Sequence, residues 1–396
     1  YYFRQFDEFV RPLLDKMRKS IIHADANDLN IIVKDKQVAG LIDFGDLMHS
    51  VLVYEIAIAN SYALMYKEDP LPWAIPIIQG YCEVLPLEEI EIDNLYYLIA
   101  TRLCMTICRA AYSKVEFPEN EYLQVSDQPA RRLLQKWISI NPAKAIDEFR
   151  KAANLPPRKK KEVGPLIQER NRHLSTVLSV SYHEPIIMEK AAFQYMFDNE
   201  GDTFLDARNN ISHVGHCHPR IAGASQRMMH TLNTNTRYIY NELNDYAARL
   251  LAKFPEPLNK VFFVNSGSAA SDLALRLAFT HTGSDKVVVM EQGYHGNTKS
   301  VIDISHYKFS SRGGKGKKDN IIVAPAPDFN HEELIENLEG RDNDIAAFIA
   351  EPIIGCAGQI PLPDDYLKEI YPVIRKQGGV CISDEVQTGF GRLGKV

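Results

Sequence analysis

The sequence predicts an α/β protein of two domains, the first mainly helical and the second built on a mostly parallel sheet with helices on both faces. Three observations support this prediction. The chain has 396 residues, which is more than one ordinary hydrophobic core accommodates. A proline-rich and basic segment, NLPPRKKKEVGP at residues 154–165, divides it. After this segment, apolar strand-like runs alternate with amphipathic helix-like runs, which is the pattern of a covered parallel sheet.

The first domain is predicted to span residues 1–153. Helical patterns dominate after residue 50, in YEIAIANSYALMY, LYYLIATRLCMTICRAAY and ARRLLQKWISI. Residues 154–165 are predicted to be a linker, because a proline pair cannot continue a helix and the basic run has no apolar face. We expect this linker to be a solvated tether, although a basic run could also bind a polyanion.

The second domain is predicted to span residues 166–396. Strands are expected at VFFVN (261–265), KVVVME (286–291), AAFIAE (346–351) and VCISDE (380–385). Two helix-like stretches, SAASDLALRLAFTHTG and DDYLKEIYPVIRKQGG, lie among them. This order favours crossover connections between parallel strands.

The composition excludes several classes of function. The formal net charge is -6, so no basic excess points to nucleic acid or to an anionic membrane surface. The 6 cysteines are scattered, which indicates reduced thiols rather than a disulfide framework or a zinc site. The longest apolar stretch falls short of the about 20 residues that span a membrane, and no secretory signal is visible. We therefore expect a cytoplasmic protein that acts on small molecules.

Residues 21–46, IIHADANDLNIIVKDKQVAGLIDFGD, carry the first candidate site. Phosphoryl transfer needs a carboxylate that accepts or orients the proton of the attacking hydroxyl. It also needs oxygen ligands for the Mg²⁺ that bridges the nucleotide phosphates. Asp25 fits the first role, and Asn30 and Asp43 fit the second. Each acid alone could be a turn residue, but the pattern H-x-D-x-x-x-x-N followed by I-D-F-G-D is far more specific.

This stretch resembles the aminoglycoside phosphotransferase and choline kinase superfamily, and GLIDFGDL running into VYEIAIA is closest to hydroxylysine kinase. The resemblance implies a mainly helical, protein-kinase-like C-lobe that uses Mg²⁺ with ATP or GTP. It implies Asp25 as the catalytic base and Asn30 and Asp43 as metal ligands. His23 would shape the loop, in which Ala24 stands where glycine is usual. The short helical stretch before the loop does not match the family's nucleotide-binding N-lobe, so we expect a truncated kinase domain.

Residues 261–278, VFFVNSGSAASDLALRLA, begin the second candidate site. Gly267 would let the backbone approach a ligand closely, and Ser266 and Ser268 would add hydroxyl donors. The helix that follows offers free N–H groups and the positive end of its dipole to an anion. A serine at this place is also an ordinary helix N-cap, so both interpretations stay open.

Further functional groups stand at the ends of the predicted strands. Tyr294 and His295 follow the strand at 286–291, Glu351 ends the next one and Asp384 follows the last. Carboxyl ends of parallel strands form the crevice in which α/β proteins bind ligands. The match GFGRLG at 389–394 is not interpreted as a dinucleotide site, because its glycines come several residues after the strand.

The stretch 166–396 resembles the class III pyridoxal-phosphate aminotransferases in NNISHVGHCHPRI, VNSGSAASDLALRLA, YHGNT, AEPIIG and SDEVQTGFGR. The resemblance implies the N-terminal part of a fold-type I transferase domain with pyridoxal 5'-phosphate as cofactor. It assigns the phosphate cradle to Ser266, Gly267 and Ser268, ring stacking to Tyr294 or His295, the ring nitrogen to Asp384 and the ring hydroxyl to Gln387. An ionised Asp384 would keep the ring nitrogen protonated, so that the ring can accept electrons from the substrate.

The same resemblance places the lysine that attaches the cofactor in a later strand region, beyond Val396, and Lys395 does not match that position. We expect the chain to be a fragment of a longer fused protein, and to be inactive alone. The parent is expected to form a homodimer through the pyridoxal-phosphate domain.

Two stretches, LNTNTRYIYNELNDYAARL (232–250) and SVIDISHYKFSSRGG (300–314), resemble the branch that contains ethanolamine-phosphate and 5-phosphohydroxylysine phospho-lyases. A fused kinase would phosphorylate an amino alcohol, and the second site would then expel phosphate and ammonia, because a phosphate ester leaves more readily than a hydroxyl. SGSAAS departs from the family's Ser-Gly-Ser-Glu-Ala-Asn at Ala269 and Ser271, and AEPIIG and DEVQTG look more like ordinary aminotransferases than like the lyases. A genuine aminotransferase with a fused kinase, and a catalytically incomplete binding or scaffold fragment, therefore stay open.

Overall fold

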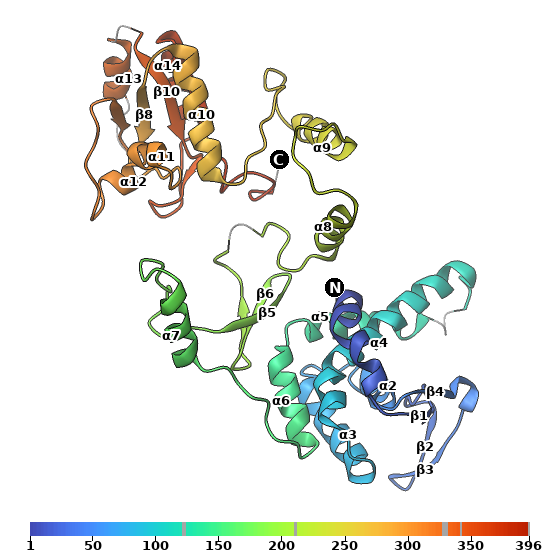
Figure 1. Cartoon of the computed structure of the whole chain (residues 1–396). Helices are drawn as coiled ribbons and strands as arrows, with labels where there is room; N and C mark the ends of the chain where they lie inside the picture. The colour runs from blue at the N-terminus through green and yellow to red at the C-terminus, as the bar shows by residue number, and fades with distance from the viewer. Residues whose placement is uncertain (121–123, 210–211, 327–331, 341–342, 395–396) are drawn as a thin grey trace. The chain divides into compact units, whose positions relative to one another are not determined.

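The computed structural model describes residues 1–396 except 121–123, 210–211, 327–331, 341–342 and 395–396, so Lys395 lies outside the described residues. The chain forms two compact units, Tyr1–Asn233 and Thr234–Val396 (Figure 1). The first unit thus contains the predicted helical domain, the predicted linker and residues 166–233 of the predicted second domain. Within the described ranges, no helix is both long enough and apolar enough to cross a membrane.

The first unit combines helices with three small sheets. In chain order its elements are α1 (Tyr2–Gln5), η1 (Phe6–Val10), η2 (Arg11–Lys16), β1 (Lys19–Ile22), β2 (Ile31–Lys34), β3 (Gln37–Leu41), η3 (Phe44–Asp46), β4 (Met48–Val51), α2 (Val53–Ala63), α3 (Leu71–Val84), α4 (Glu89–Glu116), α5 (Asp127–Trp137), α6 (Pro142–Ala152), α7 (Val163–His173), β5 (Met188–Ala192), β6 (Tyr195–Asp198), β7 (Thr203–Leu205) and α8 (Pro219–Thr231). The predicted helices at α2, α4 and α5 are confirmed.

Helix α4 is the centre of the first core, and α2, α5 and α6 pack against it. Its start is fixed by a capping box, in which the Glu91 carboxylate accepts the Glu88 N–H at 2.8 Å. The fully buried Glu91 is neutralised by Arg18, whose Nε lies 3.0 Å from its carboxylate. Leu95 and Ile99, one turn apart and both buried, place the apolar face of α4 in the core.

Strands β2 and β3 form the hairpin that follows the first candidate site. They pair antiparallel, and Asp35 and Lys36 connect them with φ angles of 51° and 64°. Positive φ at both central residues is the geometry of a tight hairpin turn that matches strand twist. The apolar runs NIIV and AGLI within residues 21–46 thus form most of the two paired strands.

The second unit is a parallel sheet between helices. Its elements are α9 (Asn241–Leu251), α10 (Gly267–Thr282), β8 (Lys286–Met290), α11 (Lys299–Ile304), α12 (His306–Phe309), β9 (Ile321–Ala324), α13 (Glu332–Glu339), β10 (Ile345–Ala350), β11 (Ile353–Ile354), β12 (Ile360–Pro361), α14 (Tyr366–Lys376) and β13 (Val380–Ser383). The main sheet has the order β13-β10-β8-β9, with every neighbouring pair parallel. The predicted strands at β8, β10 and β13 and the helices α10 and α14 are confirmed.

Both faces of this sheet are covered, as the sequence predicts. Val288 and Phe348 face a cluster that includes α13 and α14, whereas Val287 and Ile349 face one that includes α10 and α11. Neighbouring residues of a strand point to opposite faces, so a strand buried on both faces is apolar throughout. All residues of β10 are buried, in agreement with this rule.

The prediction of a strand at residues 261–265 is wrong. This segment has no strand assignment, and Phe262, Phe263 and Val264 are exposed. A strand is stabilised by pairing with a neighbour, and the main sheet of the described residues ends at β13 and β9. Apolar and β-branched composition alone therefore did not determine the outcome here.

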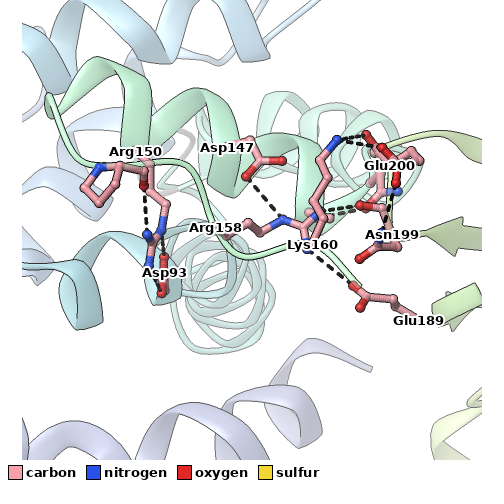
Figure 2. A network of polar contacts seen from close by, with 12 residues as sticks. Asp93, Asp147, Arg150, Arg158, Lys160, Glu189, Asn199 and Glu200 are labelled. Carbon is pink, nitrogen blue, oxygen red and sulfur yellow. Dashed lines mark hydrogen bonds and ion pairs between the residues drawn. The ribbon is translucent and has the colours of Figure 1, made fainter. Parts of the chain in front are cut away.

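The prediction that residues 154–165 form a solvated tether is also wrong. The Arg158 side chain is only 16% exposed and contacts acidic groups on both sides of the segment (Figure 2). Helix α7 begins at Val163, within the predicted linker, and Pro165 stands in its first turn, where proline is tolerated. The segment does follow the end of α6 at Ala152, but the division into two units lies at residues 233–234, and composition did not predict the contacts that the basic run makes.

Candidate functional site

The first site is organised around the carboxylate of Asp25, in the loop between β1 and β2. Its Oδ2 accepts hydrogen bonds from the side-chain amides of Asn27 and Asn30, both at 3.0 Å. Its Oδ1 accepts from the Tyr62 hydroxyl at 3.2 Å and lies 3.5 Å from Nη2 of Arg102. The structure therefore brings together the predicted base and one predicted metal ligand, and adds two partners from α2 and α4.

Tyr62 and Arg102 were not predicted from the sequence. Burial raises the pKa of Tyr62, so its hydroxyl stays protonated and available as a donor to Asp25. Arg102 donates to the same hydroxyl at 3.1 Å, which links the two residues into one network. No motif marks either residue, because both reach the loop only through the packing of distant helices.

The backbone of the loop is held by His23 and Glu55. His23 is buried, and its Nε2 lies 2.9 Å from the carbonyl oxygen of Ile42, which supports the predicted role in shaping the loop. Ala24 has a φ angle of 64°, a region that explains why glycine is usual at this place. The carboxylate of Glu55 accepts the N–H of Ala24 at 3.0 Å and so stabilises this conformation.

The predicted metal ligands flank the hairpin at its open end, Asn30 just before β2 and Asp43 two residues after β3. The N–H of Ile42 donates to the carbonyl oxygen of Asn30 at 3.0 Å, and Asp43 follows directly. Asp43 is exposed and also has a positive φ, 61°. Among the described residues, no group of three or more His, Cys, Asp or Glu side chains could hold a metal alone. The amide oxygen and the carboxylate suit Mg²⁺ as part of a shell completed by nucleotide phosphates.

A cavity of about 490 Å³ lies beside this loop, between the N-terminal segment and α2 and α4. Its walls are mostly apolar, with charged groups at a few places. The lining residues are Phe3, Phe6, Asp7, Arg11, Ile22, Ala24, Met48, Tyr54, Ala57, Ile58, Leu98, Thr101, Arg102 and Met105. Ala24 precedes Asp25 and Arg102 contacts it, so a small molecule in the cavity would lie near the carboxylate.

The second site lies at the carboxyl ends of β8, β10 and β13. His295 and Asp384 contact each other there, with 2.8 Å between Nδ1 and Oδ2 and side-chain exposures of 0% and 7%. The Nε2 atom of His295 is buried without a hydrogen-bond partner in the described part of the chain. The imidazole thus contacts Asp384, and the prediction that Tyr294 or His295 stacks on a flat ring stays a prediction.

Glu351 fixes the loop around Tyr294. Its carboxylate accepts the N–H of Tyr294 at 2.8 Å and that of Gly355 at 3.1 Å. Burial raises the pKa of Glu351, and the two backbone donors oppose that rise. Gln387 lies in the same region, since its Oε1 is the nearest atom that a Cβ added at Gly355 would meet.

Helix α10 begins as an anion cradle would. Ser266 is its N-cap, and its Oγ accepts the Ala269 N–H at 3.1 Å, so the ordinary capping role is present. Ser268 Oγ accepts the N–H of Asn297 at 3.0 Å. The first N–H groups of a helix have no partner within it, which leaves those of Gly267 and Ser268 for a ligand. A Cβ on Gly267 would stand 2.8 Å from the Val386 side chain, which would then have to move.

These residues fit pyridoxal phosphate. The start of α10 offers N–H donors to a phosphate, and the buried His295–Asp384 pair offers an acid for a ring nitrogen. Tyr294 and Gln387 stand near the same strand ends. These are the residues that the sequence singled out, and the structure adds the contact between His295 and Asp384.

Fold and site together define an α/β transferase region that follows a phosphotransfer loop. The family model described as "Aminotransferase class-III" matches residues 177–396, which is more than half of the chain, and the chain belongs to that family. The model described as "Phosphotransferase enzyme family" matches residues 3–91. The chain therefore carries a phosphotransferase-family region followed by a class III aminotransferase region.

Individual relatives agree with this assignment. The chain is 42% identical over 250 residues to "Alanine--glyoxylate aminotransferase 2-like" of Drosophila melanogaster, covering 58% of this chain and 51% of that protein. It is 34% identical over 272 residues to "Ethanolamine-phosphate phospho-lyase homolog 1" of Caenorhabditis elegans, covering 62% and 57%. A solved phospholyase from Arthrobacter in complex with phosphoethanolamine has 30% identity and a TM-score of 0.53, over 57% of each chain. The chain spans about half the length of the curated relatives it matches.

Proposed function

We propose that the chain is part of a bifunctional enzyme that phosphorylates an amino alcohol and then eliminates phosphate and ammonia from the product. The observation that carries the proposal is that one chain holds both an organised phosphotransfer loop around Asp25 and a class III crevice ending at Asp384. Two of the similar proteins are named as phospho-lyases. Such an elimination needs a phosphate ester, which a phosphotransferase supplies.

In the phosphotransferase region, Asp25 would accept the proton of the acceptor hydroxyl as the phosphoryl group arrives. Asn27 and Asn30 hold one carboxylate oxygen, and the other contacts Tyr62. This orients the carboxylate toward the loop. Asn30 and Asp43 would bind Mg²⁺ together with the phosphates of ATP or GTP.

In the class III region, pyridoxal phosphate would supply an electron-accepting ring that stabilises negative charge on the substrate carbon next to nitrogen. The first N–H groups of α10, at Gly267 and Ser268, would bind its phosphate. Asp384 would hold a proton at the ring nitrogen, and His295 keeps Asp384 in place. Removal of the proton beside the amine and departure of phosphate from the neighbouring carbon give, after hydrolysis, an aldehyde and ammonia.

A second candidate is a true aminotransferase, and one observation favours it. The relative with 42% identity is named as an aminotransferase. That reaction would use the same cradle and the same Asp384, but it would require a keto acid and would release no phosphate. The two reactions therefore differ in their products rather than in their cofactor.

The test uses the full-length protein that carries this chain, supplied with pyridoxal phosphate. O-phosphoethanolamine and 5-phosphohydroxylysine are added separately, and phosphate release is measured without any keto acid. Release that Asp384→Ala abolishes and Asp365→Ala preserves supports the lyase, because Asp365 is an exposed acid just before α14 whose side chain pairs with Lys368. Amino transfer that appears only with a keto acid, and no phosphate release, would replace the lyase by the aminotransferase.

A further inference from the structure

The basic segment between α6 and α7 contacts both of its flanking regions. Arg158 lies between the two, with Nε 3.2 Å from Asp147 of α6 and Nη1 3.5 Å from Glu189 of β5 (Figure 2). Its Nη2 also donates to the carbonyl oxygen of Asn199 at 2.5 Å. A guanidinium with two ion pairs and one hydrogen bond to different elements joins those elements, whereas a tether leaves its charges in water.

The backbone of the segment is paired as well. Lys161 donates its N–H to Oδ1 of Asn199 at 3.0 Å, and Nδ2 of Asn199 donates to the Lys161 carbonyl at 3.0 Å. Asn199 is 1% exposed, so these two hydrogen bonds are shielded from water. Lys160 adds an ion pair with Glu200 at 2.8 Å, and the Lys161 ammonium lies 3.0 Å from Glu189. The side chains of Asn199 and Glu200, just after β6, thus bind the segment.

A second contact joins the same two regions without using the segment. Asn141 caps α6 by accepting the N–H of Ala143 at 2.8 Å. Its Nδ2 donates to the carbonyl oxygens of Asp198 and Asp202, at 2.9 and 2.7 Å. Asn141 is 1% exposed. Because one buried amide serves both the helix start and the turn between β6 and β7, the helix and the sheet depend on each other.

We propose that the helices around α4 and the β5–β6–β7 sheet fold and unfold as one body, with residues 154–161 as the clamp that joins them. The partner of the basic run is the acidic surface of this chain, formed by Asp147 on the helical side and by Glu189 and Glu200 on the sheet side. The clamp connects a phosphotransferase region to the first strands of the class III match. The inference stands independently of which reaction either region catalyses.

Limited trypsin digestion of the intact chain tests the clamp. Residues 158–161 are expected to be cut more slowly than the exposed basic loop at 315–318, which serves as an internal reference. Arg158→Ala is expected to raise the cleavage rate at 159–161 by about tenfold, because it removes three contacts. Lys159→Ala is the matched control: it removes the same charge and one trypsin site, and Lys159 is exposed. Equal cleavage of both basic runs in the unchanged protein would overturn the proposal.

A second measurement uses the unchanged protein and does not depend on how a variant folds. The 2 tryptophans, Trp73 and Trp137, both lie on the helical side, so their fluorescence reports unfolding of that side alone. Hydrogen exchange of the amides in β6 reports the sheet. The two unfolding transitions are expected to coincide in urea, and the amide of Lys161 is expected to be protected. A sheet that exchanges fully while tryptophan fluorescence stays native would contradict the single body.

Discussion

Replacement of Arg150 by alanine is expected to destabilise the helical region by about 2 kcal/mol. The side chain is 8% exposed and extends from α6 toward α4. It donates to the two carboxylate oxygens of Asp93 at 2.6 and 2.7 Å, to Glu89 at 3.0 Å and to the Pro156 carbonyl at 2.9 Å. These hydrogen bonds, above all those to Asp93, raise the pKa of Arg150 above its ordinary value, so the guanidinium stays charged.

The size of the loss in stability depends on whether water can solvate the carboxylates of Asp93 and Glu89 once the arginine is gone. Loss of one partner from a fully buried ion pair costs about 3–5 kcal/mol, because the remaining charge has no solvent. Asp93 and Glu89 are 37% and 56% exposed, so water can replace the guanidinium at both carboxylates. The expected cost is therefore lower than for a buried pair, but above the about 0–1 kcal/mol of a surface pair.

The assay is urea unfolding followed by fluorescence of the tryptophans, of which Trp137 is fully buried at the end of α5. Arg131→Ala is the matched control, since Arg131 is 45% exposed and pairs with Asp127 one turn away at 2.8 Å. The control is expected to change the free energy of unfolding by less than about 0.5 kcal/mol. A double-mutant cycle with Asp93→Ala isolates the pairwise part. An Arg150→Ala effect no larger than the control would refute the reasoning.

Four further changes have defined outcomes. Gly80→Ala is expected to raise the free energy of unfolding by about 0.5–1 kcal/mol in the same titration, because the glycine is exposed within α3 and an added Cβ meets nothing within 4 Å. Tyr62→Phe in the full-length protein is expected to lower kcat for phosphoryl transfer about threefold to tenfold and to leave the nucleotide KM unchanged, because one hydrogen bond to Asp25 is lost. Gly267→Val is expected to weaken pyridoxal-phosphate binding at least about tenfold in an absorbance titration, because its side chain would occupy the start of α10. Burial raises the pKa of Glu351 above its ordinary value of 4.5. The free energy of unfolding of the wild-type protein is therefore expected to fall as the pH rises from 4.5 through the raised pKa. Glu351→Gln is expected to remove this pH dependence when unfolding is measured over the same pH range.

Local patterns predicted those parts of the fold that depend on local chemistry. The period of apolar residues located α4, α10 and α14, and short apolar runs located β8, β10 and β13. The run at 261–265 has the same composition as these strands but is unpaired in the described structure. A strand forms when it pairs with another strand, and that partner is often distant in the sequence. The composition of one segment carries no information about the partner.

In the candidate sites, too, local spacing identified some residues, and others are brought in only by the tertiary fold. Asp25 and Asn30 are five residues apart in one loop, so a spacing pattern could identify both. Tyr62 and Arg102 contact Asp25 from α2 and α4, and no spacing relates them to it. Arg158 was expected to be solvated because the basic run has no apolar face. Its partners Glu189 and Asn199 are distant in sequence, so no local pattern indicates them. Only the tertiary fold determines which acids a basic run meets.

The backbone of the first loop connects local strain with function. A positive φ at a residue other than glycine costs about 1 kcal/mol, and Ala24 bears that cost immediately before Asp25. The same conformation directs the Ala24 N–H to Glu55, on a helix that also supplies Tyr62 to Asp25. Because α2 thus fixes both the backbone before the carboxylate and one of its oxygens, a shift of this helix would move the acid and its hydrogen-bond partner together. The strained Ala24 therefore couples the position of α2 to the position of the candidate catalytic carboxylate of Asp25.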